Sequence, residues 1–256
     1  MYNNIFDSHA HYDDDSFSED LTELLKGLPS KGISHVVNCG TDINSCEKLA
    51  EISDKYNYIY FAAGIHPHEA EDANEGFIEE LKAFTKHPKC VAIGEIGLDY
   101  HYDFSPRDIQ REVFEKQLIL AKELELPVII HDREAHEDTL KLLKKYTPKG
   151  IVHCFSGSVE MAKDIVSLGM HIGLGGAVTF KNAKKPVEVA KYVPLERLVL
   201  ETDCPYMTPV PFRGKRNDSS LISVTADFIA ELKGISTQEL LDKTHENAKN
   251  IFAIKE

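Results

Sequence analysis

Short apolar runs recur along the whole chain and alternate with segments of helical periodicity. The runs are rich in β-branched residues, as strands are, and they lie at residues 4–6, 36–39, 59–65, 91–98, 128–130, 151–155, 170–174 and 198–201. Between them, apolar residues return every three or four positions, for example at Leu21, Leu24, Leu25 and Leu28. The pattern therefore predicts a repeated unit of one strand followed by one helix.

Such alternation indicates parallel strands joined by crossover helices, and about eight repeats in a chain of this length favour a closed (β/α)8 TIM barrel over an open doubly wound sheet. After the last run come a proline-rich and basic stretch, residues 205–217, and two segments of helical pattern, residues 221–232 and 238–251. Ser236, followed by Glu239, is typical of a capping box. No linker divides the chain, so we expect residues 1–256 to form a single domain with C-terminal helices.

The composition indicates the class of protein and the cellular compartment. The chain is 42% hydrophobic and 28% charged, which is ordinary for a globular protein. No apolar run is long enough to span a bilayer and no secretion signal precedes the first strand, so we expect a cytoplasmic protein without membrane contact. The 5 cysteines are odd in number and lack C-x-x-C spacing, which argues against a disulfide framework and a zinc ribbon. Nothing predicts an obligate protein partner.

The net charge of −13 limits the ways in which the chain can bind nucleic acid. A surface of this sign repels a phosphate backbone at long range, which excludes a protein that coats DNA without specificity. A nucleic acid substrate is still allowed, because bound divalent cations reverse the sign of the potential where they sit.

Histidines and carboxylates fall at the ends of the predicted strands. His9 and His11 are one residue apart, so in a strand both side chains point to the same face. The same position at a strand end is shared by His66, Glu95, His131, His153 and Asp203. Each alone could be a buried histidine bonded to backbone or a carboxylate that caps a helix. Together on the carboxyl-terminal rim of a barrel, where ligands bind, they predict one metal site.

The carboxylates suggest how that site is organised. Glu95 lies inside an apolar strand, where an unpaired carboxylate is costly, and a position bridging two cations would compensate. His131 and His153 follow branched apolar strands and are suited to bind a divalent transition metal. Asp203 shares a face with Glu201 at a spacing of two residues. We expect Asp203 to ligate metal and accept a proton from bound water, and Glu201 to support the site, with an additional cation as the alternative.

The substrate side of the prediction rests on one histidine and one basic cluster. His66 is expected to donate a hydrogen bond to the phosphate or the leaving oxygen of a phosphate-ester substrate. Asp203, Glu95 and His66 therefore form the predicted catalytic set. His68 is interpreted as loop structure. Arg213, Lys215 and Arg216 are expected to bind the substrate backbone, because guanidinium groups match phosphate oxygens. The alternative for this cluster is a solvated basic turn.

Seven ordered motifs resemble a known family. They read DSHAH, GIHPH, GEIGLDY, IIHDRE, HCFSG, ETDCPY and RGKRN and run from residue 7 to residue 217. In this order they are similar to the TatD family of metal-dependent hydrolases within the amidohydrolase superfamily. The resemblance implies a TIM barrel and activity as a deoxyribonuclease or 3′ to 5′ exonuclease on DNA, sometimes RNA. It also implies one metal site from His9, His11, Glu95 and Asp203, and another from Glu95, His131 and His153.

The expected reaction is therefore hydrolysis of phosphodiester bonds in DNA, or another nucleic acid, by a hydroxide that bridges two divalent cations. Imidazole ligands favour zinc or manganese as the bound metals, and magnesium is expected to support activity. Two alternatives stay open. One is a metal-dependent ester hydrolase such as a D-aminoacyl-tRNA deacylase, and the other is a metal-binding module without catalysis.

Overall fold

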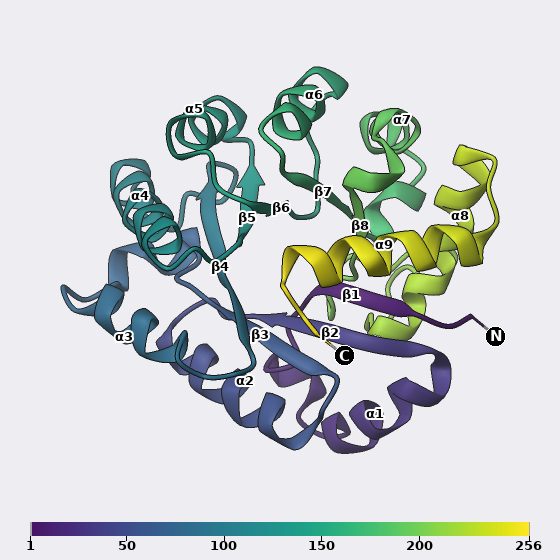
Figure 1. The fold of residues 1–256 in the computed structure, drawn as a ribbon, viewed down its shortest axis with the longest axis horizontal. Coiled ribbons are helices and arrows are strands. Elements are labelled where there is room, and N and C mark those ends of the chain that lie inside the picture. The colour runs from purple at the N-terminus through teal and green to yellow at the C-terminus, as the bar shows by residue number, and fades with distance from the viewer. Residues whose placement is uncertain (1, 256) are drawn as a thin grey trace.

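The computed structural model describes residues 2–255, and its centre is a ring of eight parallel strands in sequential order (Figure 1). The strands are β1 (Ile5–Ala10), β2 (Ile33–Cys39), β3 (Ile59–Ala63), β4 (Cys90–Asp99), β5 (Val128–Arg133), β6 (Gly150–Val152), β7 (His171–Leu174) and β8 (Leu198–Leu200). The first and last strands meet at a bridge between Ala10 and Cys204, where the His11 amide donates to the Cys204 carbonyl at 2.8 Å. The predicted TIM barrel is thereby confirmed.

Helices cover the outside of the ring (Figure 1). They are α1 (Leu21–Gly27), α2 (Ile43–Lys55), α3 (Phe77–Phe84), α4 (Arg107–Glu123), α5 (His136–Tyr146), α6 (Val159–Ser167), α7 (Lys184–Tyr192), α8 (Ile222–Lys233) and α9 (Thr237–Ile251), with short 3-10 turns that include η3 (Pro67–Asp72) and η6 (Ser219–Leu221). Side-chain caps begin several of them. At α9 the Ser236 side chain accepts from the Glu239 amide at 3.2 Å, which is the first of the two hydrogen bonds of the predicted capping box.

Alternation along the strands separates two buried layers. Val128 and Ile130 of β5 pack in the layer between sheet and helices, whereas Ile129 belongs to the cluster inside the barrel. Ile151 and Val199 lie in the same interior cluster. Because side chains two positions apart in a strand share a face, the residues two places further along β5, β6 and β8 are directed into the barrel at its carboxyl end.

The third strand ends earlier than its apolar run predicts. The run continues to Ile65, but β3 stops at Ala63. The reason is a side chain of α4: the Ile65 amide donates to Gln117 Oε1 at 2.7 Å and the Ile65 carbonyl accepts from Gln117 Nε2 at 3.0 Å. A glutamine thus replaces a neighbouring strand as hydrogen-bond partner, and the chain turns toward the barrel mouth at His66.

The segment after α9 closes the amino end of the barrel. Phe252 and Ile254 belong to the interior cluster with Phe6 and Val37, and the rings of Phe6 and Phe252 stack at 6.0 Å. In Figure 1, α9 crosses in front of β1 and β8. The amino end of the barrel is therefore filled by side chains, and in residues 2–255 only the carboxyl end is open to a ligand.

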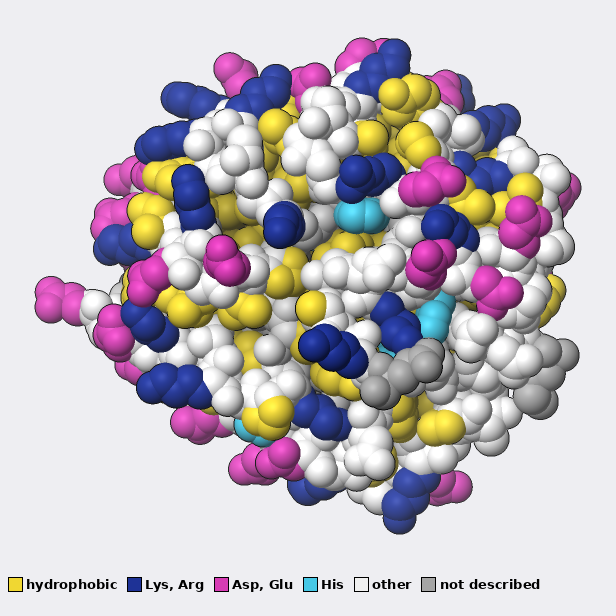
Figure 2. All heavy atoms as spheres, in the orientation of Figure 1, with side chains coloured by type: hydrophobic (Ala, Val, Ile, Leu, Met, Phe, Trp, Pro, Cys, Tyr) yellow, Lys and Arg dark blue, Asp and Glu magenta, His cyan; other side chains and the backbone are white. Residues whose placement is uncertain are grey.

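On the face drawn in Figure 2, lysine and arginine side chains are interspersed with aspartate and glutamate.

None of the helices in residues 2–255 has both the length and the apolar character that crossing a membrane requires.

Candidate active site

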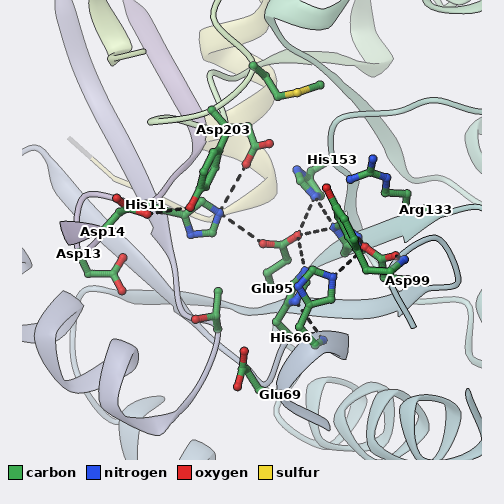
Figure 3. A pocket seen from close by; sticks show the side chains of 16 residues that line it. His11, Asp13, Asp14, His66, Glu69, Glu95, Asp99, Arg133, His153 and Asp203 are labelled. Atoms are coloured by element: carbon green, nitrogen blue, oxygen red, sulfur yellow. Dashed lines mark hydrogen bonds and ion pairs between the residues drawn. The ribbon is translucent and has the colours of Figure 1, made fainter. Parts of the chain in front are cut away.

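A cavity of about 560 Å³ opens at the carboxyl ends of the strands. Its walls come from the segments that follow β1, β2, β3, β4, β5, β6 and β8, and they are made of His11, Asp13, Asp14, Thr41, His66, His68, Glu69, Glu95, Asp99, Tyr102, His131, Arg133, His153, Asp203, Tyr206 and Met207. Figure 3 shows these side chains converging on Glu95, with Asp13 and Asp14 to one side and Asp99 and Arg133 to the other. The cavity is therefore lined by ionisable groups from almost every strand.

Glu95 is the centre of this arrangement, and its two oxygens face different histidines. Oε2 lies 3.2 Å from His9 Nε2 and 3.4 Å from His11 Nε2. Oε1 lies 2.8 Å from His131 Nδ1 and 2.7 Å from His153 Nε2. This buried carboxylate thus lies between two sets of imidazoles, one on each oxygen, and its role as a bridge between two cations stays a prediction.

Asp203 completes the set on the Oε2 side. Its Oδ1 is 3.5 Å from His11 Nε2 and 3.7 Å from His9 Nε2. The segment after β8 is tied to β1 by a hydrogen bond from the Asp203 amide to the His9 carbonyl at 2.9 Å. Two main-chain segments almost two hundred residues apart in sequence therefore hold three ligand-type side chains together.

The partners of the remaining ring nitrogens decide which nitrogen faces the cavity. His11 Nδ1 lies 3.0 Å from the Cys39 carbonyl, which can only accept, so this nitrogen carries a proton and Nε2 is the nitrogen directed at Glu95. His131 lies between two carboxylates, with Nε2 3.1 Å from Asp99 Oδ2 and Nδ1 2.8 Å from Glu95 Oε1, so Nδ1 is the nitrogen that faces the centre of the cavity. Hydrogen bonds of this kind orient imidazoles for metal binding.

His153 lies next to Glu201, which has no exposed surface. Glu201 Oε1 accepts from the Cys154 amide at 2.5 Å and lies 3.6 Å from His153 Nδ1, an ion-pair distance that is too long for a hydrogen bond. The carboxylate fits because Gly173 of β7 has no side chain: a Cβ there would approach Glu201 Oε2 at 2.5 Å. This geometry is compatible with the supporting role predicted for Glu201.

His66 is a neutral histidine whose hydrogen bond fixes the position of its proton. Its Nδ1 accepts a hydrogen bond from the His68 amide at 3.2 Å, and burial, partly offset by Glu95, lowers the pKa of His66 well below its usual value. The ring is therefore neutral, with its proton on Nε2, which lies 3.6 Å from Glu95 Oε1. A protonated nitrogen has no lone pair for a metal, so His66 is suited to donate a hydrogen bond to an oxygen in the cavity.

The charges of the site are strongly coupled. Burial disfavours ionisation of Glu95, but the surrounding histidines, His153 and His9 foremost, outweigh it and hold the pKa of Glu95 well below the usual range. Burial likewise opposes the charged form of His11, yet hydrogen bonds with Asp203 and Glu95 raise the pKa of His11 to about 10. Both shifts indicate that the site pairs buried negative charge with positive charge.

The donor set fits divalent cations. The facing nitrogens His9 Nε2 and His11 Nε2 are 3.0 Å apart, and those of His131 and His153 are 3.2 Å apart. Ligand atoms bound to one zinc ion at 2.0–2.1 Å in tetrahedral geometry are separated by about 3.3 Å. The atoms of His9, His11 and Asp203 also lie within 4.8 Å of one another, as one ion requires. Imidazole and carboxylate donors at these separations can therefore hold metal.

Asp99, His68 and Arg133 are among the residues of the cavity wall that the sequence analysis did not assign to the site. Asp99 is fully buried, and its Oδ2 accepts from both His131 Nε2 and His68 Nε2, the latter at 2.9 Å. His68 is part of η3, in the segment interpreted as loop structure, but it also lines the cavity. Among the cavity-lining residues of the described chain, Arg133 is the only arginine or lysine. The signal for Asp99 was available, since it ends a strand in the same way as the other candidates.

The predicted basic cluster lies outside the cavity wall. Arg216 donates to both carboxylate oxygens of Asp20, at 2.7 and 2.6 Å, and stacks on the Phe17 ring at 4.7 Å. Arg213 lies over the ring of Phe180 at 4.0 Å. Lys215 lies over the ring of Phe212 at 5.6 Å. The structure therefore does not bring this cluster together with the predicted metal ligands, and its role toward substrate stays a prediction.

A parallel (β/α)8 barrel that gathers buried imidazoles and carboxylates at the carboxyl ends of its strands belongs to the class of metal-dependent hydrolases. The model of the family described as "TatD related DNase" matches residues 6–253, and the chain belongs to this TatD family. The resemblance seen in the seven motifs is thus confirmed.

Relatives and solved structures cover nearly the full length. An uncharacterised metal-dependent hydrolase of Bacillus subtilis, YabD, is 46% identical over 98% of this chain and 99% of its own length. A protein of Rahnella named 3'-5' ssDNA/RNA exonuclease TatD is 34% identical over 93% of this chain and 94% of its own. The crystal structure of the Escherichia coli TatD homologue YJJV is similar with a TM-score of 0.94 at 31% identity, covering 100% of both chains. The chain is thus similar to these proteins in sequence and fold throughout.

Proposed function

We propose that this chain is a metal-dependent nuclease that hydrolyses phosphodiester bonds of single-stranded DNA or RNA, working from the 3′ end. The observation that carries the proposal is the cavity itself, in which five further predicted metal ligands gather around the buried carboxylate of Glu95 and a single guanidinium lines the same wall. The Rahnella relative and one from Klebsiella pneumoniae, 31% identical, are both named 3'-5' ssDNA/RNA exonuclease TatD, which supports the choice of substrate.

Two divalent cations are part of the proposal. His9, His11 and Asp203 would hold one with Glu95 Oε2, and His131 and His153 would hold the other with Glu95 Oε1. Cations bound there would supply Lewis-acid activation of the phosphate and of a water molecule. Nitrogen-rich ligand sets favour zinc or manganese as the bound ions, and magnesium would support activity less well.

The side chains around the cations divide the remaining work. Arg133 would hold a phosphate oxygen, because its guanidinium has the geometry for two parallel hydrogen bonds. His66 would donate its Nε2 proton in a hydrogen bond to the leaving oxygen. Asp203 would accept the proton of the attacking water, since hydrogen bonding to His11 and the charge of His153 outweigh burial and keep the pKa of Asp203 low enough for it to be ionised.

The test compares substrates with a defined metal. Protein stripped with EDTA and then loaded with zinc, manganese or magnesium is incubated with 3′-labelled and 5′-labelled single-stranded DNA, RNA, blunt duplex DNA and D-aminoacyl-tRNA. We expect stripped protein to be inactive, and loaded protein to shorten single strands from the 3′ end. Release of the amino acid from tRNA without any cleavage of oligonucleotides would replace the nuclease by the ester hydrolase. Metal uptake without hydrolysis of any substrate would leave only a metal-binding module.

A further inference from the structure

The mouth of the cavity carries aromatic side chains that are exposed to solvent. Tyr102 and Phe104, in the segment between β4 and α4, are 47% and 65% exposed, and Tyr206, in the segment after β8, is 56% exposed. Tyr102 and Tyr206 line the cavity, whose other lining residues are polar or ionisable with the exception of Met207. Leaving large rings in water beside a polar site has a cost in solvation, so an aromatic ligand is the natural partner for them.

Tyr102 and Phe104 form a stacked pair next to the cluster of histidines. Their ring centroids are 5.2 Å apart and the planes are inclined by 18°. The ring of His68 meets both with its edge, at 5.5 Å from Tyr102 and 4.8 Å from Phe104. The pair is therefore a stack of two rings beside the cavity wall, with an imidazole against both of them.

Main-chain hydrogen bonds hold this segment in place. Asp99 Oδ1 accepts from the amides of His101 and Tyr102 at 3.0 and 2.9 Å, while its other oxygen accepts from His131 and His68. Ser105 donates to the His68 carbonyl at 2.9 Å. One buried carboxylate thus connects the aromatic segment to a predicted metal ligand. A surface positioned in this way binds a flat ligand without first having to be ordered.

Arg133 adds a cation at the inner side of the pair. Its guanidinium lies 4.6 Å from the centre of the Tyr102 ring and borders the cavity. A flat aromatic surface next to a guanidinium is the combination that binds single-stranded nucleic acids, in which bases stack on side chains and phosphates meet arginine. A duplex would not suit it, since paired bases already stack on their neighbours.

We propose that Tyr102 and Phe104 form a stacking site for an unpaired nucleobase next to the scissile phosphate, with Arg133 holding the adjoining phosphate. This inference rests on the proposed nuclease function and assigns its substrate class: the end of a single strand, bound through the face of a base and not through its hydrogen-bonding edge. Because every base has such a face, the site would tolerate any sequence.

The test is a cycle that removes the side chains and the base separately. Tyr102→Leu/Phe104→Leu keeps apolar bulk but removes both rings, and an abasic analogue at the terminal nucleotides of a single-stranded oligonucleotide removes the base. We expect either change alone to lower kcat/KM about 5- to 150-fold, mainly through KM, as loss of one base stack does. The two changes together should lower kcat/KM little more than either change alone. If the combined loss in kcat/KM equalled the product of the two separate losses, the stacking site would be wrong.

Tyr192→Leu is the matched control. Tyr192 is 40% exposed at the end of α7 and has Lys163 over its ring at 5.3 Å, the same kind of contact that Arg133 makes, but it lies outside the cavity wall. Its kcat and KM should stay within twofold of the unmodified protein. Circular dichroism should show that all variants are folded. A KM change as large in Tyr192→Leu as in the double variant would contradict the proposal.

A second measurement separates this inference from the nuclease function. Metal-loaded protein is titrated with a hydrolysis-resistant phosphorothioate oligonucleotide that carries 2-aminopurine at its end, whose fluorescence falls on stacking. Quenching in the unmodified protein that is lost in the double variant supports the site. Quenching without turnover of any nucleic acid would reject the nuclease and retain the stacking site. Turnover without quenching would do the reverse, and quenching that persists in the double variant would place the base elsewhere.

Discussion

Glu95 concentrates the electrostatics of the site in one residue, because each of its oxygens faces its own pair of imidazole nitrogens. A neutral amide of the same shape would keep the packing but would replace one anionic oxygen by an N–H donor. We therefore expect metal binding by the two histidine sets to depend more on the charge of Glu95 than on its volume.

We expect Glu95→Gln to lose bound metal and to lower kcat/KM by at least about 100-fold, with the fold retained. Metal content by mass spectrometry and circular dichroism of the same sample measure the two effects. Glu112→Gln is the control, because Glu112 is exposed and pairs only with Lys116 one helical turn away, at 2.7 Å. If Glu95→Gln retained the full metal content of the unmodified protein, the bridging role of Glu95 would be wrong.

Asp99 acts on the site through His131. Asp99→Asn keeps an oxygen for the amides of His101 and Tyr102 but removes the negative charge that fixes the His131 ring. We expect metal affinity to fall about 10- to 100-fold, as is typical when the partner of a metal-binding histidine is changed. Calorimetric titration with zinc measures it. Asp103→Asn, which changes an exposed carboxylate paired with Arg107, should bind zinc as before, and an equal loss in both variants would point to the loop instead.

Some residues of the site could be predicted from the sequence and others could not. The spacing of His9 and His11 and the ends of apolar runs located the histidines and carboxylates that gather around Glu95, because parallel strands bring their carboxyl ends together. Arg216 lies outside the cavity wall, where it forms an ion pair with Asp20. Because Asp20 is far from Arg216 in sequence, this pair could not be predicted from the sequence. Arg133 had no such signal, since an arginine at a strand end is common on any surface.

At the scale of elements, the pattern of apolar runs predicted every strand of the barrel but missed some of the residues at which the strands begin and end. β2 begins at Ile33, three residues before its predicted run. β6 stops at Val152 although its run continues to Phe155, and β3 stops at Ala63. Strand ends depend on which hydrogen-bond partner takes over from the sheet. The sequence could not show that a glutamine of α4 would be that partner for the third strand.

The contact between β2 and α9 predicts a dependence of stability on pH. His35 stacks on Phe6 at 5.1 Å, and its Nδ1 is 3.3 Å from His245 Nε2. Burial, together with His245 and Lys249, lowers the pKa of His35 to about 4, whereas an unfolded histidine titrates near about 6.5. Between these values the unfolded chain binds more protons, so stability is complete above about pH 6.5, falls as the pH drops toward 4, and levels off below.

We expect His35→Phe to flatten this fall in the free energy of unfolding, by on the order of 1 kcal/mol between pH 6.5 and 4, since partial exposure reduces the effect. Urea unfolding at a series of pH values measures it. A remaining slope is expected from His171, because burial lowers the pKa of His171 to about 4 as well. Ile119→Val, which changes an exposed residue that carries no titratable group, should leave the slope unchanged. An unaltered slope in His35→Phe would contradict the assignment.

At the scale of the whole molecule, the predicted ligands come from β1, β4, β5, β6 and the segment after β8, so bound ions would link strands around the ring. Ligands that bind only the folded chain stabilise it, by about 2.7 kcal/mol at a concentration 100 times the dissociation constant. For a chain of this size we expect zinc to raise the Tm of stripped protein by roughly 5–10 °C. Calorimetric scans measure the shift, and a similar shift in Glu95→Gln would mean that zinc binds elsewhere.

Both ends of the described chain lie at the plugged end of the barrel. β1 begins there at Ile5, and Ile254 packs among the interior side chains at the same end. The cavity opens at the other end. An affinity tag, fluorophore or surface tether joined to either end would therefore point away from the mouth and leave it accessible to a long polymer. Immobilised protein should thus be suitable for following the shortening of individual strands by single-molecule methods.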